Sequence, residues 1–194
     1  MFWTEDAHRR LHVDKNAVRR AISDLLQAIG EDPGRLRGTP DTVAEAALEL
    51  YGGYGQDPAA GLEVIAGPDN LIVMRDIPFF SMCEHHLLPF FGRAQIALLP
   101  KDGRIAGFGS LARVVDVCAR RLQIQERLTE EVADALWRGL SPQGVYVSLQ
   151  AQQLCMQMVG GREIGAVTVT VAARGALSEG RLRDEALRLF GTGA

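Results

Sequence analysis

The chain has 194 residues, of which 47% are hydrophobic and 23% charged, and its formal net charge is −3. This length can bury one sizeable core, and a weakly acidic chain without runs of like charge excludes a basic nucleic-acid surface. No apolar stretch approaches the roughly 18 residues of a membrane span, and the charged N-terminal segment is unlike a secretory leader. We therefore expect a cytoplasmic protein that binds neither nucleic acid nor membrane.

The N-terminal part of the chain carries two helical patterns. Apolar residues recur at helical spacing over residues 14–29, with Asp14 as the candidate N-cap and Gly30 as the stop. A second helix is predicted to begin at Thr39-Pro40, because proline is favoured in the first turn of a helix. Gly52-Gly53 is predicted to end it.

After the second helix the hydrophobic pattern becomes alternating. The glycine- and proline-rich residues 52–70 indicate a linker. Alternation predicts strands at residues 71–77, 93–99, 145–155 and 166–173. Helical spacing predicts helices at residues 110–122, 126–140 and near 181–190. The fold class is therefore α+β, with a helical extension at residues 1–55 followed by one larger domain at residues 56–194.

Three cysteines, at positions 83, 118 and 155, are an odd number and widely spaced, so we expect no disulfide framework. Cys83 and His86 are three residues apart, a spacing that lets a thiolate and an imidazole reach one tetrahedral Zn²⁺. Taken alone, the pair is more typical of a buried thiol beside a surface histidine. Cys155 is the candidate third ligand, because Cys118 falls on the apolar face of a predicted helix. Three protein ligands with an open fourth position are typical of catalytic zinc.

Several segments together resemble the GTP cyclohydrolase I family. They are CEHH at residues 83–86, followed by PFFGRAQIALLPKDGRIAGF, then QIQERLTEEV, then LCMQM, and the N-terminal AVRRAISDLLQAIGEDP. The resemblance covers residues 14–190. It implies a tunnelling fold of β-β-α-α-β-β units, assembled into a homodecamer of two stacked pentamers with active sites between subunits. It also implies Zn²⁺ at the positions of Cys83, His86 and Cys155.

The resemblance also implies a reaction. In the family, a zinc-bound water attacks C8 of the purine, the imidazole ring opens, C8 leaves as formate, and the ribose recloses as a pterin. His85 matches the histidine that acts as acid and base. Glu126 matches the carboxylate that accepts from guanine N1–H and the 2-amino group, and Gln125 matches a substrate contact. Without the resemblance, Gln125-Glu126 is better explained as a solvated helix start.

Some positions depart from the family pattern. Gln153 replaces a second catalytic histidine, and an amide cannot shuttle a proton near neutral pH. Because residues 153 and 155 share a face of the predicted strand, Gln153 is still expected to point at the site. Among the phosphate-binding positions, Arg113 is retained. Cationic positions of the family are occupied instead by Ser110, Val159 and Thr42, and the alternative phosphate contacts are Arg35, Arg37, Arg75 and Arg162.

These departures predict a divergent enzyme. We expect a zinc-dependent cyclohydrolase that opens the imidazole ring of a guanine-type purine less phosphorylated than GTP, with formate release and pterin formation left incomplete. One alternative is an ordinary GTP cyclohydrolase I that makes dihydroneopterin triphosphate. Another is a non-catalytic paralogue that binds zinc and a purine. In each case we expect a homo-oligomer, because an open strand edge tends to pair with another chain. The resemblance implies that this oligomer is a decamer.

Overall fold

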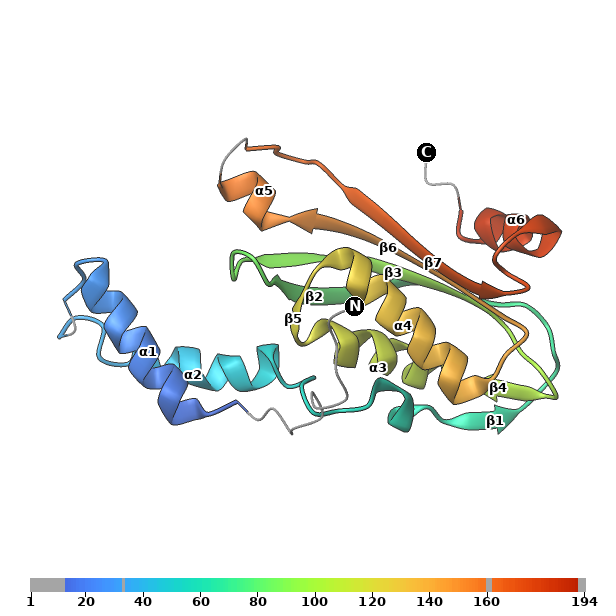
Figure 1. The fold of residues 1–194 in the computed structure, drawn as a ribbon, viewed down its shortest axis with the longest axis horizontal. Coiled ribbons are helices and arrows are strands. Elements are labelled where there is room, and N and C mark those ends of the chain that lie inside the picture. The colour runs from blue at the N-terminus through green and yellow to red at the C-terminus, as the bar shows by residue number, and fades with distance from the viewer. Residues whose placement is uncertain (1–12, 33, 160–161, 192–194) are drawn as a thin grey trace, which may run out of the picture. The chain divides into compact units, whose positions relative to one another are not determined.

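The computed structural model describes residues 13–32, 34–159 and 162–191, and the chain divides into two compact units, Met1–Gln56 and Asp57–Ala194. The first unit contains helices α1 (Lys15–Ala28) and α2 (Thr39–Leu50), which pack against each other (Figure 1). As predicted, Asp14 caps α1, its side chain accepting a hydrogen bond from the Ala17 amide at 3.0 Å. Gly30 follows α1 with φ +82°, which glycine adopts without strain.

The second unit follows the predicted order of two strands, two helices and two strands. These elements are β2 (Ile72–Cys83), β3 (Pro89–Leu99), α3 (Phe108–Ala119), α4 (Gln125–Leu140), β6 (Gly144–Gln153) and β7 (Thr168–Gly175). With the short β5 (Leu122–Gln123), the strands form one sheet in the order β5-β2-β3-β6-β7, antiparallel except between β5 and β2. The α+β class and the β-β-α-α-β-β order of a tunnelling fold are therefore confirmed.

The segment predicted to be a linker contains regular structure. A 3₁₀ helix, η2 (Pro58–Gly61), precedes β1 (Val64–Ala66), and β1 pairs with β4 (Arg104–Ala106) outside the main sheet. Three-residue strands are too short to show alternation, so the sequence did not predict them. Among the residues that the structure describes, no helix combines the length and apolar character needed to cross a membrane.

The prediction of a strand through residue 155 was wrong. Strand β6 ends at Gln153, and the chain turns there into the short helix α5 (Leu154–Met158). The reason is the partner strand: β3 begins at Pro89, and its second residue, Phe90, already pairs with Gln153. Cys155 therefore lies on a helix and does not share a strand face with Gln153.

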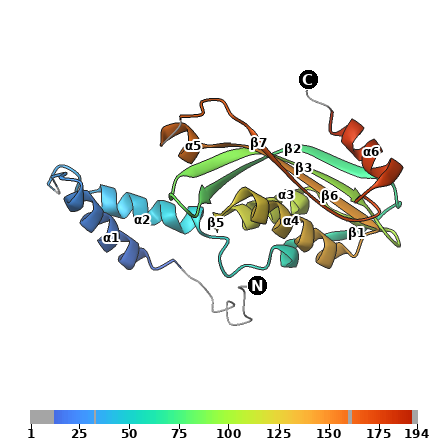
Figure 2. The ribbon, with the colours of Figure 1, turned by 45° about the horizontal axis from the view of Figure 1, so that its top comes forward.

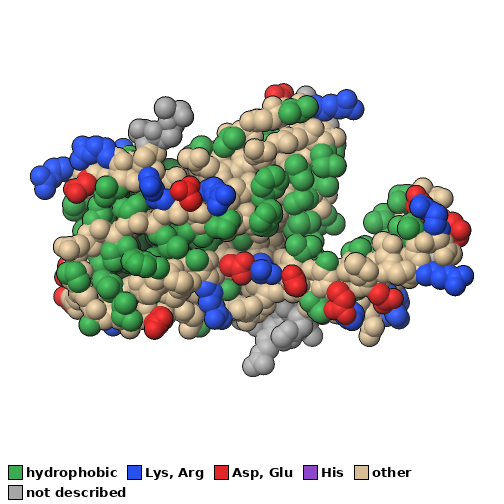
Figure 3. Space-filling view, turned by 180° about the vertical axis from the view of Figure 1, so that it is seen from behind, with side chains coloured by type: hydrophobic (Ala, Val, Ile, Leu, Met, Phe, Trp, Pro, Cys, Tyr) green, Lys and Arg blue, Asp and Glu red, His purple; other side chains and the backbone are tan. Residues whose placement is uncertain are grey.

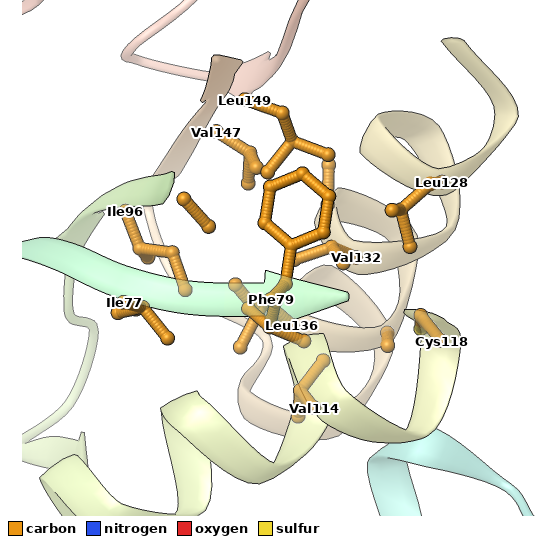
Figure 4. Packing of buried hydrophobic residues seen from close by; sticks show 14 of the residues in the cluster. Ile77, Phe79, Ile96, Val114, Cys118, Leu128, Val132, Leu136, Val147 and Leu149 are labelled. Carbon is orange, nitrogen blue, oxygen red and sulfur yellow. The ribbon is translucent and has the colours of Figure 1, made fainter. Parts of the chain in front are cut away.

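Helices α3 and α4 cover one face of the sheet, and the main core lies between them and the strands (Figures 1 and 2). Figure 4 shows Phe79 of β2 lying among Leu149 of β6 and Leu128 and Val132 of α4, all buried. Each such side chain stabilises the fold by about 1.5–3 kcal/mol through burial. The final helix, α6 (Gly180–Leu189), packs over a second cluster on the opposite face of the sheet.

Candidate functional site

The site begins at the turn between β2 and β3. Cys83 is the last residue of β2, and its amide donates to the Leu88 carbonyl at 2.8 Å, while the Leu87 amide donates to the Cys83 carbonyl at 2.9 Å. Leu87 adopts φ +54°, a left-handed conformation unusual for a branched side chain. This tight turn brings Cys83 Sγ to 3.6 Å from His86 Nδ1, with Cys83 buried and His86 exposed.

Cys155 joins these two residues from α5. One ligand atom from each of Cys83, His86 and Cys155 lies within 4.8 Å of the other two. In a tetrahedral zinc site, bonds of about 2.3 Å to sulfur and about 2.0–2.1 Å to nitrogen place two ligand atoms about 3.6–3.8 Å apart. The 3.6 Å separation of Cys83 Sγ and His86 Nδ1 fits this geometry. This group of described residues offers three ligand atoms, so one position of a tetrahedral metal site is left for another ligand.

The donor atoms of this group favour a metal that binds sulfur. Burial, and after it the neighbouring Cys83 sulfur, raises the pKa of the Cys155 thiol. Two adjacent thiolates would repel each other, and the positive charge of a bound cation would offset this repulsion. Zn²⁺ supplies that charge and accepts sulfur and imidazole ligands, whereas Mg²⁺ and Ca²⁺ prefer oxygen.

A polar network ties the Cys83–His86 turn to helix α4. The Glu84 amide donates to the Gln123 carbonyl at 3.1 Å, next to the short parallel pairing of β2 with β5. The Glu84 carboxylate accepts a hydrogen bond from Arg127 Nη2, which lowers the pKa of Glu84. Arg127 Nε also donates to Gln123 Oε1 at 2.8 Å. The turn is thus attached to the first turn of α4 through a charge-assisted contact.

Gln125 and Gln153 contact each other beside the metal-binding group. Gln125 is buried at the start of α4, and its Nε2 donates to the carbonyls of Leu149 and Thr168, both at 3.1 Å. Its Oε1 accepts from Gln153 Nε2 at 2.8 Å and from the Thr168 hydroxyl. Gln153 is half-buried on the face of β6 that the helices cover, directly before the helix that carries Cys155.

His85 and Glu126 are exposed at the same end of the sheet. The His85 side chain is 64% exposed, and its Nε2 lies 3.7 Å from Glu84 Oε1. Glu126 lies in the first turn of α4, directly after Gln125. Both side chains are therefore accessible from solvent.

Ser110 and Arg113 lie away from this group within one chain. Both belong to α3, where Ser110 is buried and donates to the Gly107 carbonyl at 2.7 Å, while Arg113 is exposed. The opposite end of α3 approaches the site, because Ser81 Oγ of β2 donates to the Ala119 carbonyl at 2.7 Å. Ser110 precedes Ala119 by about 14 Å of helix. Ser110 therefore lies at the end of α3 remote from the site, and Arg113 lies in the middle of the helix with its side chain beside Gly61 of η2.

Arg127 and Thr168 contact site residues but were missed from the sequence. Arg127 stands in the QERL segment beside Glu126, and its neighbours drew the attention. Thr168 and Thr170 alternate with apolar residues in β7 and face α4, where the Thr170 hydroxyl hydrogen-bonds to the Thr129 hydroxyl at 2.6 Å. Polar residues on the helix-covered face of a strand were the available signal, because buried polar groups require partners.

Comparison with known proteins agrees with the resemblance. The family model described as GTP cyclohydrolase I matches residues 18–191. GTP cyclohydrolase 1 of Halalkalibacterium halodurans is 47% identical over 183 residues, which cover 92% of this chain and 97% of that protein. GTP cyclohydrolase 1 of Carboxydothermus hydrogenoformans is 44% identical over 184 residues, covering 92% and 96%. The apo crystal structure of the archaeosine synthase QueF-Like aligns with 56% of this chain at 14% identity and a TM-score of 0.44, too weak a likeness to support an inference. The chain belongs to the GTP cyclohydrolase I family.

Proposed function

We propose that this protein is a zinc-dependent cyclohydrolase that opens the imidazole ring of a guanine nucleotide at C8. The observation that carries the proposal is the convergence of Cys83, His86 and Cys155, with ligand atoms within 4.8 Å of one another. It occurs in a chain that spans 97% of a relative named GTP cyclohydrolase 1. When bound there, Zn²⁺ supplies Lewis acidity that lowers the pKa of a water molecule toward about 7.

The side chains around the metal-binding group supply the remaining functions. His85 is the proposed acid and base, and its exposed ring lies 3.7 Å from the Glu84 carboxylate that Arg127 holds in place. Glu126 is the proposed acceptor for guanine N1–H and the 2-amino group. Its exposed position in the first turn of α4 leaves it accessible to a purine. Two-point pairing of this kind rejects adenine, because buried hydrogen-bonding groups would be left unpaired.

We propose GTP as the substrate. The names of the relatives support GTP, and they lend no support to the divergence that we predicted from Gln153, Ser110, Val159 and Thr42. Each charge-assisted contact to phosphate contributes about 1.5–3 kcal/mol, or roughly 10- to 150-fold in affinity. Comparing the activity towards guanine compounds with different numbers of phosphates therefore distinguishes GTP from a less phosphorylated substrate.

We also propose that a second copy of the chain completes the site in a homo-oligomer, a decamer by the resemblance. The distance along α3 supports this, because Ser110 and Arg113 precede Ala119, at the end of the helix near the site, by about 14 and 9 Å of helix, and the Arg113 side chain lies beside Gly61 of η2. The last strand of the sheet, β7, carries valines that are each more than half exposed, at positions 169 and 171. Figure 3 shows hydrophobic side chains gathered in patches on one face. Pairing between copies would cover such an edge.

Mass spectrometry of products tests the activity. Zinc-loaded protein is incubated with GTP, GMP, guanosine, guanine and 8-oxoguanine beside a Cys83→Ala control. Conversion of GTP to dihydroneopterin triphosphate with release of formate supports the proposal. A hydrated product that keeps the formyl carbon, or preference for unphosphorylated compounds, would establish the divergent enzyme. Tight purine binding without turnover at any zinc loading would establish the non-catalytic paralogue.

Subunit mixing tests the shared site. Cys83→Ala and Arg113→Ala variants should each be inactive alone, and light scattering should report an oligomer for both. If one copy supplies the metal ligands and another supplies Arg113, mixed oligomers contain some complete sites and regain activity. An elution volume near the monomer mass, or no recovery in mixed oligomers verified by tagged pull-down, would contradict a site completed by a second copy.

A further inference from the structure

The orientation of the Gln125 amide is determined by its surroundings. Two backbone carbonyls, of Leu149 and Thr168, lie 3.1 Å from its Nε2 atom. Carbonyl oxygens can only accept hydrogen bonds, so the amide nitrogen of Gln125 has to face them. The Oε1 atom must then face Gln153 and the Thr168 hydroxyl. All hydrogen-bonding capacity of this buried amide is used within the protein.

Gln125 in turn determines which end of Gln153 faces inward. Because Gln125 Oε1 is an acceptor, Gln153 must present its Nε2, which lies 2.8 Å away. The second contact of Gln153 Nε2 is to Thr168 Oγ1 at 3.5 Å. Within the described part of the chain, the hydrogen bonds of the Gln153 side chain all run through its nitrogen, so its Oε1 atom is an acceptor without a protein donor.

We propose that Gln125 is a positioning residue that holds Gln153 with its carbonyl oxygen toward the metal-binding group, where this oxygen accepts a hydrogen bond from the bound purine nucleotide. The inference rests on the proposed function and assigns a role to a residue that departs from the family pattern. Gln153 directly precedes α5, whose second residue is Cys155, so the Gln153 backbone lies next to the metal-binding group. The substrate group that it recognises is a neutral N–H or O–H donor near the reacting carbon.

This arrangement reproduces the hydrogen bonding of a histidine at position 153 but not its proton transfer. A neutral imidazole could donate one N–H to Gln125 Oε1 and offer its other nitrogen as an acceptor. The Gln153 amide likewise presents a donor to Gln125 and an acceptor at its other terminal atom, but it cannot take up a proton. The position therefore contributes substrate binding and orientation, while proton transfer is left to other groups such as His85.

The test uses substitutions at two adjacent glutamines of β6. Gln153→Met removes both hydrogen-bonding ends at similar length, and Gln153→His restores a donor and an acceptor. Gln152→Met is the matched control, because Gln152 lies on the opposite face of the strand, where its Oε1 accepts from Gln157 at 3.3 Å. GTP binding to metal-free protein is measured by calorimetry, and kcat and KM are measured on the zinc-loaded form together with zinc content.

We expect Gln153→Met to weaken GTP binding to the metal-free protein about tenfold and to lower kcat/KM by at least as much. Gln153→His should restore both to within about threefold at pH 8, where imidazole is mainly neutral. Gln152→Met should match the wild type, and all forms should retain equal zinc, which separates substrate contact from a merely structural role.

Three results would overturn the inference. The first is unchanged GTP binding and kcat/KM in Gln153→Met, and the second is equal losses in Gln153→Met and Gln152→Met. The third is activity of Gln153→His far above the wild type, which would mean that proton transfer at this position limits the rate. If wild-type protein binds and converts GTP, these results count against the role of Gln153 alone. If the wild type neither binds GTP without metal nor releases formate with zinc, the proposed function fails, and this inference with it.

Discussion

The two ends of the main sheet differ in what they bury. At the end that carries Cys83, the interior includes Gln123 and Gln125, and each amide is hydrogen-bonded to protein groups. At the other end, α6 covers an apolar cluster that includes Tyr146 and Phe190. Burial of an apolar side chain stabilises the fold in proportion to the area buried, whereas a buried amide is tolerated only when its hydrogen-bond partners are placed correctly. The polar end therefore holds its side chains in defined positions, as the proposed site requires, whereas the apolar end stabilises the fold.

Removing a metal ligand should produce the largest effect. Cys83→Ala should lose Zn²⁺ and lower formate release by roughly 1,000-fold or more, about 4 kcal/mol in barrier. Zinc content by mass spectrometry and formate by enzymatic assay provide the measurements. Cys118→Ala is the matched control, since Cys118 is a fully buried thiol in the core and should leave zinc binding intact. Loss of zinc from both variants would show that global damage explains the result.

Truncation in the apolar core should act on stability instead. Leu136 is fully buried in the cluster between α4 and the sheet, and Leu136→Ala should lower the free energy of unfolding by about 2–5 kcal/mol. Urea denaturation of the zinc-loaded protein measures this change. Below the unfolding transition, kcat should stay within about threefold of the wild type, because the cavity lies outside the site. A large loss of kcat with little loss of stability would contradict the division of roles between core and site.

Disrupting the network behind the turn should weaken the metal site moderately. Arg127→Met removes the cation that binds Glu84 and Gln123, and we expect zinc affinity to fall about 10- to 100-fold. Competition with a chelator measures the affinity. Arg174→Met is a useful control, because Arg174 pairs with Glu130 and Asp134 on α4, further from the turn. Equal zinc affinity in the two variants would mean that Arg127 does not position the ligands.

The smallest expected effect concerns the pH dependence of stability. Burial raises the pKa of the Cys118 thiol to about 12 from its ordinary value of 9.0. The unfolded chain therefore loses this proton above about pH 9 while the folded protein keeps it, so stability is lost as pH rises toward 12. The slope is at most about 1.4 kcal/mol per pH unit. Denaturation at pH 8, 9 and 10 should show a shallower decline for Cys118→Ala, and identical slopes would contradict a buried neutral thiol.

The sequence predicted the elements whose residues alternate over long stretches. Such alternation is a local pattern, so it can be read along the chain. The spacing of Cys83 and His86 left the metal site open, Cys155 was the candidate third ligand, and the family resemblance implied all three. The short β1–β4 pair shows no such pattern, because three residues are too few to reveal an alternation.

The contacts that organise the site depend on tertiary structure. Gln125 and Gln153 are far apart in the chain, and their hydrogen bond exists only because α4 lies against β6. The end of β6 at Gln153 depends likewise on where β3 begins. Sequence reasoning identified both glutamines as site residues through the family resemblance, but it could not show that they bind each other.

Zinc titration measures whether the metal-binding group is required for formate release. Metal-free protein is titrated with Zn²⁺ in the presence of GTP while formate is measured, with Cys155→Ala as the control. Formate release should rise in proportion to added zinc, reach a plateau at one Zn²⁺ per chain, and stay at background in Cys155→Ala. Formate release from rigorously metal-free protein, or zinc binding at one per chain without any formate, would contradict the proposed function.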